Sequence, residues 1–188
     1  PLEEELRRVM PVVEGLAGAA PVSIDTTKAE VARQAIAAGA RIVNDVTALR
    51  GDPEMAGACA EAGVEVVLMH MLGTPRTMQE DPRYDDVVGE VSEFLAVQAG
   101  LAEAAGIARE KLWIDPGIGF GKTVDHNLAL LKSTRTLSEM GLPVLVGPSC
   151  KSFIGKLSGD APEPRRLGGT IAACLAAMEG GAAMVRVH

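Results

Sequence analysis

Aromatic residues and cysteines are scarce in this sequence, and each scarcity narrows the kinds of protein it can encode. Aromatics make up 3% of the 188 residues, so the core must form from aliphatic and small side chains. The three cysteines, Cys59, Cys150 and Cys174, are widely spaced and form no C-x-x-C pair. This pattern disfavours a disulfide framework or a structural zinc site, and it favours a reducing, cytoplasmic location.

The chain also lacks an excess of positive charge and a long apolar run. Its formal net charge is −7, and no basic cluster offsets it. We therefore expect neither nucleic acid nor an anionic membrane as a partner. No apolar stretch approaches the roughly 20 residues of a membrane-spanning helix. The acidic residues 3–5 are also atypical of a signal peptide, which begins with basic residues.

What the sequence does contain is a regular alternation of short apolar segments and amphipathic segments. Nearly continuous apolar runs of this length indicate the strands of a parallel sheet that is covered on both faces. We predict six strands, at residues 21–25, 41–46, 64–70, 111–115, 143–147 and 183–188. We predict helices at about residues 3–16 (with a kink at Pro11), 28–40, 53–63, 85–105, 125–141 and 164–182. Left-handed glycines are expected after the later helices, at Gly39, Gly63, Gly106, Gly141 and Gly180.

Two architectures fit these repeats, an open doubly wound sheet and a (β/α)8 barrel. Every predicted strand ends in or just before polar residues, namely Asp25, Asn44, His70, Asp115, the 149–151 turn, Arg186 and His188. An open sheet carries function mainly at its switch point, whereas all the strand ends of a barrel face one mouth. The pattern therefore favours an α/β fold of the (β/α)8 TIM-barrel class.

A complete barrel has eight strands and about 250 residues, and this sequence offers about six strands. We therefore expect residues 1–188 to form a single, incomplete barrel domain within a longer polypeptide. In this interpretation the two N-terminal strands and the C-terminal helix lie outside the chain.

Residues 112–123, LWIDPGIGFGKT, deliver a carboxylate to the end of a strand and follow it with a glycine-rich loop. A P-loop would need glycine where Pro116 stands, and the glycine spacing does not fit a dinucleotide fingerprint either. An aspartate at a strand end can simply cap a turn. Asp115 can also accept two parallel N–H bonds from a planar ligand edge. We favour this second role, in which the glycines leave room for a flat ligand beside Phe120.

Polar residues on the neighbouring strands point to the same ligand. Asn44 lies inside an apolar strand, where an unpartnered amide costs about 1–3 kcal/mol, so it needs a ligand or a hydrogen-bond network. Asp25 could bind a ligand or cap the next helix, and the sequence leaves both roles open. Asp45 points to the opposite face by strand alternation and is expected to be structural. His70 is likewise expected to be a hydrogen-bonded structural residue.

The last two strands bring positive charge. Lys151, after the strand at 143–147, is either solvated or functional. Arg186 and His188 are two residues apart, so both face the same side of a strand. Two inward donors of this kind need an anion, which indicates a diphosphate or a carboxylate. The predicted ligand therefore has a flat, donor-rich ring and an anionic tail.

Six motifs, SIDTTK, IVNDVTAL, LMHMLGTPRTMQ, WIDPGIGFGKT, VLVG-x-S-x-KSFIG and VRVH, resemble in order the strand motifs of the dihydropteroate synthase family. These barrel enzymes of folate biosynthesis join 4-aminobenzoate to a dihydropterin diphosphate and release diphosphate. The resemblance implies pterin-binding roles for Asp25, Asn44, Met69, Asp115, Phe120, Gly147 and Lys151. It places Ser152 at the aminobenzoate and Arg186 and His188 at the diphosphate, and it makes Lys151, Arg186 and His188 the catalytic residues.

The resemblance also implies Mg²⁺, a homodimer and a target for sulfonamides. The family's asparagine ligand for the metal lies before residue 1, so we expect no metal ligand in this chain. The turn before Lys151 departs from the family, because Pro148 replaces a small residue and Cys150 replaces arginine. We therefore expect weaker handling of aminobenzoate or diphosphate. Three alternatives stay open: a pterin-binding methyltransferase domain, a non-catalytic pterin-binding fragment, and a plain structural barrel.

Overall fold

The computed structural model describes residues 1–188, which fall into two compact units. The first unit comprises Pro1–Met69 and Val97–Trp113, and the second comprises His70–Ala96 and Ile114–His188. Helix α4 (Val87–Ala104) and strand β4 (Leu112–Asp115) pass from one unit to the other. None of the helices combines the length and apolar composition that crossing a membrane requires.

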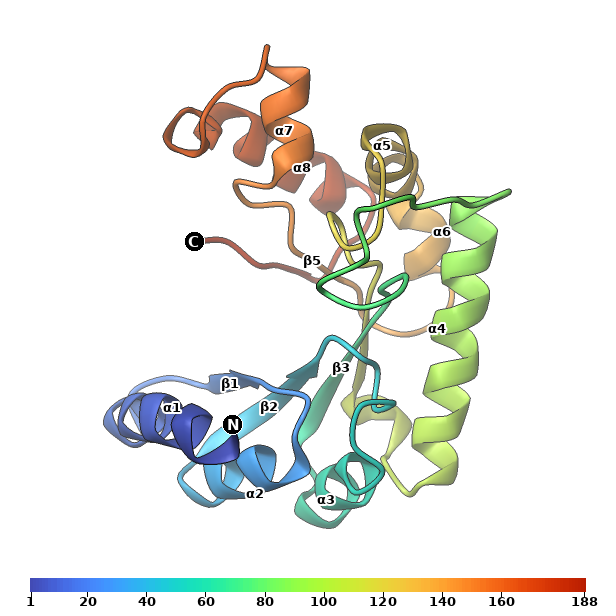
Figure 1. Cartoon of the computed structure of the whole chain (residues 1–188). Coiled ribbons are helices and arrows are strands. Elements are labelled where there is room, and N and C mark those ends of the chain that lie inside the picture. Colours follow the sequence, from blue (N-terminus) through green and yellow to red (C-terminus); the bar gives the residue numbers. More distant parts are fainter. The chain divides into compact units, whose positions relative to one another are not determined.

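The first unit is built on parallel strands flanked by helices (Figure 1). Its elements before α4 are α1 (Leu2–Leu16), β1 (Val22–Asp25), α2 (Ala29–Ala37), β2 (Ala40–Asp45), α3 (Met55–Ala62) and β3 (Glu65–Met69). A short 3-10 helix, Arg109–Lys111, leads into β4, and the sheet order is β1-β2-β3-β4. The indole of Trp113 donates to Glu65 at 2.6 Å, which ties the start of β4 to β3.

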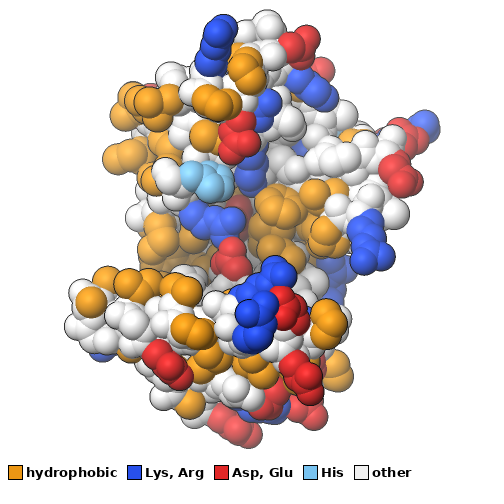
Figure 2. Space-filling view, turned by 60° about the vertical axis from the view of Figure 1, so that its left-hand side comes forward, with side chains coloured by type: hydrophobic (Ala, Val, Ile, Leu, Met, Phe, Trp, Pro, Cys, Tyr) orange, Lys and Arg blue, Asp and Glu red, His pale blue; other side chains and the backbone are white.

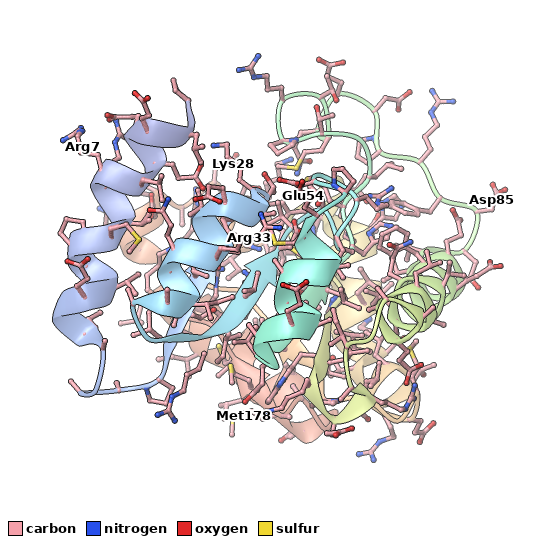
Figure 3. The ribbon with its side chains drawn as sticks, turned by 90° about the horizontal axis from the view of Figure 1, so that it is seen from below. Arg7, Lys28, Arg33, Glu54, Asp85 and Met178 are labelled. Atoms are coloured by element: carbon pink, nitrogen blue, oxygen red, sulfur yellow. The ribbon has the colours of Figure 1, made fainter.

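Apolar side chains on these strands and helices form the core of the first unit. Val43 and Val66 are paired across β2 and β3 and are fully buried, as is Val31 on α2. At the surface, Arg33 on α2 pairs with Glu54 beside α3 at 2.8 Å (Figure 3). An exposed pair of this kind contributes little to stability, so the buried valines hold this layer together.

The second unit combines a small parallel sheet with a group of helices. Its elements after β4 are α5 (Val124–Lys132), α6 (Thr134–Ser138), β5 (Leu145–Val146), α7 (Ser152–Leu157), a 3-10 helix (Glu163–Arg165), α8 (Leu167–Glu179) and β6 (Met184–Val185). Strands β5 and β6 are parallel, and Ile114 bridges to Val144. Helices α7 and α8 both pack on α5 (Figure 1).

The six strands and most helices match the sequence prediction, but several details differ. The helix expected at 125–141 is two helices divided at Ser133. Its first part starts at Val124 because Thr123 accepts the His126 N–H in a capping box. Helix α7 was not predicted, and β5 and β6 are shorter than expected. Gly180 is not left-handed (φ −72), and Gly181 takes that conformation instead (φ 94).

Candidate functional site

The predicted site residues are divided between the two units. Asp25, Asn44 and Met69 belong to the first unit, at or near the C-terminal ends of β1, β2 and β3. The second unit holds the others, namely Asp115, Phe120, Gly147, Lys151, Ser152, Arg186 and His188. The structure therefore defines a carboxylate–amide group in the first unit and a charged group in the second.

Asp25 and Asn44 are register partners at the ends of β1 and β2. Asn44 Nδ2 donates to Asp25 Oδ1 at 2.7 Å, while Asn44 Oδ1 is buried and has no hydrogen-bond partner. A buried acceptor without a partner costs about 1–3 kcal/mol, so this oxygen marks a place where a ligand donor is favoured. Met69 is buried at the end of β3.

Asp25 does not cap the helix that follows it. The first N–H groups of this helix bond elsewhere: that of Ala29 donates to Asp52 Oδ2 at 2.9 Å, and that of Lys28 donates to Thr26 Oγ1 at 3.2 Å. The helix-cap alternative for Asp25 is therefore wrong, because other oxygens already serve these donors.

Asp45 has the structural role that strand alternation predicted. It is fully buried, and its carboxylate accepts the backbone N–H groups of Thr47 and Leu49 at 2.8 and 3.0 Å. The Thr47 hydroxyl donates to it as well, at 2.7 Å. These bonds shape the turn after β2 and leave Asp45 no role at a ligand.

Asp115 is the central carboxylate of the second unit. It ends β4 and is 5% exposed; its Oδ1 accepts the Gly117 N–H at 2.7 Å, and its Oδ2 accepts no hydrogen bond from the chain. Burial raises the pKa of this carboxyl, and the Gly117 N–H, Lys151, Lys122 and Arg186 act to lower it. The open oxygen can therefore accept a hydrogen bond from a ligand.

Lys151 follows β5 and reaches toward the loop after Asp115. Its ammonium donates to the Ile118 carbonyl and lies 4.4 Å from the centre of the Phe120 ring. Burial lowers the pKa of Lys151 to about 8; Asp115 acts to raise it and Arg186 to lower it further. The lysine is therefore mostly charged at neutral pH and stacked on an aromatic face.

The glycines of this loop make room for the chain's own side chains. Gly119 has φ +83, and a Cβ there would lie 2.6 Å from Lys151 Cδ. Gly121 has φ +63, and a Cβ there would lie 2.8 Å from the Leu72 carbonyl oxygen. Both glycines are thus required by their backbone conformation and by close neighbours. The additional clearance for a flat ligand stays a prediction.

Arg186 and His188 lie beyond the end of β6. The Arg186 N–H continues the β5–β6 pairing by donating to Val146 at 3.0 Å. His188 Nδ1 lies 3.0 Å from the hydroxyl of Ser149, which also accepts the His188 N–H at 3.3 Å. Arg186 and His188 are exposed, and Figure 2 shows a histidine beside basic side chains on the visible face.

Two further predicted residues complete this group. Gly147 directly follows β5, and a Cβ there would lie 3.8 Å from Arg186 Cβ, which is an ordinary contact. Ser152 is the first residue of α7 and is exposed. The ligand roles of all these residues stay predictions, although the structure brings Asp115, Phe120, Lys151 and Arg186 together.

Lys122 is a charged residue of the second unit that the sequence reasoning missed. It is 3% exposed, and its Nζ lies 3.0 Å from His70 Nδ1 and 2.9 Å from the Phe120 carbonyl. These contacts confirm His70 as a buried, hydrogen-bonded histidine. The lysine stood inside a rejected P-loop pattern, and the neighbouring glycines and apolar strand were the signal that it could be buried.

The chain belongs to the pterin-binding enzyme family. The family model described as "Pterin binding enzyme" matches residues 1–188. The chain is 46% identical to the dihydropteroate synthase of Synechocystis and covers 65% of that protein's length. It is 48% identical to the dihydropteroate synthase of Escherichia coli K12, of which it covers 66%. The chain thus spans about two thirds of the length of these curated relatives, and the match covers 100% of the chain.

Solved structures show the same relationship. The chain resembles the dihydropteroate synthase of Stenotrophomonas maltophilia, solved with imidazole bound in its active site, with a TM-score of 0.96 and 49% identity over 100% of the chain and 71% of that protein. The Xanthomonas albilineans enzyme in complex with 7,8-dihydropteroate matches with a TM-score of 0.93 and 48% identity. This match covers 100% of the chain and 69% of that protein. Because dihydropteroate synthases are TIM-barrel enzymes, this likeness confirms the predicted α/β barrel class.

Proposed function

We propose that this protein acts as a dihydropteroate synthase, joining a dihydropterin diphosphate to 4-aminobenzoate with release of diphosphate. The observation that carries the proposal is Asp115, a buried carboxylate with an open oxygen in reach of positive charge. A relative supports the proposal: the Xanthomonas albilineans dihydropteroate synthase is solved in complex with 7,8-dihydropteroate and, in a second structure, with 4-aminobenzoic acid.

Asp115 recognises the pterin ring in this proposal. The 2-amino group and N3–H of a pterin form a planar pair of donors, which an ionised carboxylate accepts in parallel. Asn44 Oδ1, which lacks a partner, supports a further pterin contact, and the proposal assigns Asp25 and Met69 to the same ligand. Phe120 and Gly147 line the slot for the ring, and Lys151 donates to it.

Arg186 and His188 bind the diphosphate in this proposal. During the reaction the bond between the pterin methylene carbon and the diphosphate oxygen breaks, and the oxygen takes the electron pair. The aminobenzoate nitrogen forms the new bond to that carbon and then loses a proton to solvent. The protein orients both substrates and stabilises charge on the leaving diphosphate, with Ser152 at the aminobenzoate.

Magnesium, the dimer, a cytoplasmic location and sulfonamide binding belong to the proposal as well. The chain has no group of three His, Cys, Asp or Glu side chains that could hold a metal ion. The proposed roles of Arg186 and His188 rest on their own positive and donor groups.

The test is an assay of diphosphate release that depends on added 4-aminobenzoate, coupled to detection of dihydropteroate. We expect turnover by the protein and loss of turnover in Lys151→Met. An exposed lysine on α5, changed in Lys132→Met, is the matched control and keeps turnover. Tight pterin binding without turnover would favour a non-catalytic pterin-binding protein. Absence of both binding and turnover would contradict the proposal.

A further inference from the structure

Lys122 is a buried lysine with three acceptors around its ammonium group. Nζ donates to the Phe120 carbonyl at 2.9 Å, lies 3.0 Å from His70 Nδ1, and reaches the His70 carbonyl at 3.4 Å. A lysine ammonium has three donors and no acceptor, so this arrangement fits the protonated form. His70 then accepts at Nδ1 and carries its own ring proton on Nε2, a tautomer assigned from this contact.

These contacts connect Lys122 to Asp115 through the backbone. The His70 N–H donates to the Asp115 carbonyl at 3.0 Å, and the Phe120 N–H donates to the Gly117 carbonyl at 3.0 Å. Lys122 thus holds both the residue that hydrogen-bonds to Asp115 and the loop that follows it. The backbone anchor therefore acts on the main chain of Asp115, and the charge acts on its carboxylate.

Three positively charged side chains act on Asp115, and they differ in whether they are also assigned to a substrate. Lys151, after β5, and Arg186, after β6, act with Lys122 to lower the pKa of Asp115 against the effect of burial. Lys151 and Arg186 are assigned to the substrates, so a ligand competes for their charge. Lys122 is directed only at groups of the chain itself, so its effect on Asp115 does not depend on a ligand.

The surroundings of Lys122 show what limits its charge. Burial lowers the pKa of Lys122 to about 7; Asp115 acts to raise it, and Lys151 lowers it further. The other titratable groups nearby are His70, which contacts the ammonium, and Tyr84, whose ring centre lies 6.0 Å from that of His70. The Tyr84 hydroxyl is occupied by the Gly121 carbonyl at 2.8 Å. Below neutral pH, where carboxyl groups titrate, Lys122 is therefore charged.

Resting on the proposed function, we propose that Lys122 is a positioning residue for pterin binding, which keeps Asp115 ionised and fixes the Gly117–Gly121 loop. An ionised carboxylate offers two acceptors to the two N–H groups of the pterin edge. A protonated carboxyl has one oxygen occupied by a proton, so it opposes one of these donors. Lys122 itself does not touch the pterin.

The experiment measures affinity for a dihydropterin that carries no diphosphate, so that Arg186 and His188 contribute little. Titration calorimetry is run from neutral pH down to the acid limit of the folded protein, because burial raises the pKa of the Asp115 carboxyl. The variants are Lys122→Met, which removes both charge and donors, and Lys122→Gln, which removes the charge and keeps an N–H₂ donor for Phe120. Lys132→Met, on the exposed face of α5, is the matched control.

As the pH falls, pterin affinity is lost around a midpoint pH. We expect this midpoint to lie about one pH unit higher in both Lys122 variants, which makes their affinity about tenfold lower than that of the wild type at pH values below the wild-type midpoint. Lys132→Met keeps the wild-type midpoint. Circular dichroism shows whether each variant folds. If Lys122→Met does not fold, the midpoint of Lys122→Gln is the test. A uniform loss of affinity at every pH, with the wild-type midpoint, would overturn the proposal and leave Lys122 a purely structural residue.

The outcome for the wild type separates the two proposals. A wild-type protein that binds the dihydropterin, with unshifted midpoints in the variants, contradicts only the role of Lys122. A folded wild-type protein that does not bind it contradicts the proposed function, and the role of Lys122 with it.

Discussion

Ser149 holds His188 through two contacts with one hydroxyl group. Its Oγ lies 3.0 Å from the imidazole Nδ1 and accepts the His188 backbone N–H at 3.3 Å. Ser149 is 5% exposed, so water cannot easily replace these contacts. A residue that is not itself assigned to a substrate thus fixes one that is assigned to the diphosphate.

We expect Ser149→Ala to weaken binding of the dihydropterin diphosphate by about three- to tenfold, because one net hydrogen bond contributes about 0.5–1.5 kcal/mol. Affinity for a dihydropterin without diphosphate should not change, because His188 is assigned only to the anionic tail. Calorimetry with the two ligands makes the comparison. Equal losses for both would show that Ser149 acts on the fold and not on His188.

Gly119→Ala should displace Lys151, since the new Cβ would lie 2.6 Å from Lys151 Cδ. The left-handed backbone (φ +83) adds about 1–2 kcal/mol of strain for any residue with a Cβ. Gly159→Ala is the matched control, because Gly159 is also left-handed (φ +68) but has nothing within 4 Å of its Cβ position. Urea unfolding should show both variants destabilised, whereas only Gly119→Ala should lose pterin affinity. Loss of affinity in both would point to backbone strain alone.

Several site features were predictable from sequence because they depend on neighbours along the chain. A polar residue at the end of an apolar strand, as at Asp115 and Asn44, is visible in the pattern itself. Lys122 is different, because its burial depends on His70, a residue 52 positions away. The same holds for Gly119, whose closest neighbour, Lys151, lies on a distant segment. Contacts of this kind are set by packing, which periodicity does not encode.

The fold shows the same limit. Hydrophobic patterns predicted six strands, and the short β5 and β6 still fall within the predicted ranges. The break at Ser133 was missed because residues 125–141 have uniform helical character. The short α7 was missed because its six residues lie between Pro148 and Pro162, in a segment that resembles a loop. The class of the fold was predictable, and the ends of elements were less so.

Lys122 should make stability depend on pH in a defined direction. Burial lowers its folded-state pKa to about 7, against an ordinary value of 10.5. Between these two pKa values the unfolded chain binds more protons than the folded chain, so the free energy of unfolding rises with pH through this window. Below the window the lysine is charged in both states, and the full cost of burying its charge lowers the stability. From neutral pH upward, the free energy of unfolding of the wild type should rise, relative to that of Lys122→Met, by up to about 1 kcal/mol per pH unit.

Urea unfolding of the wild type, Lys122→Met and the exposed control Lys132→Met across this window measures the effect. The control should run parallel to the wild type. Parallel curves for Lys122→Met as well would mean that Lys122 keeps an ordinary pKa in the folded protein.

Cys150 offers a gain-of-function test. Its backbone is left-handed (φ 54) and is held by Thr170 Oγ1 on the N–H and Arg166 on the carbonyl, at 3.0 and 2.8 Å. At residue 150 these bonds use only the backbone N–H and carbonyl, so a longer side chain there does not remove them. Cys150→Arg should lower KM for one of the two anionic substrates by at least about threefold, because it adds a charge-assisted donor. Cys150→Gln is the uncharged control, and no gain with arginine would contradict the expected weakness at this turn.

The central claim is that Asp115 recognises the pterin, and calorimetric titration with the dihydropterin diphosphate tests it most directly. The wild type should bind, and Asp115→Asn should lose at least about 30-fold in affinity, because an amide replaces one of two acceptors with a donor and removes the charge. Equal affinity of the folded wild type and the folded variant would contradict the claim.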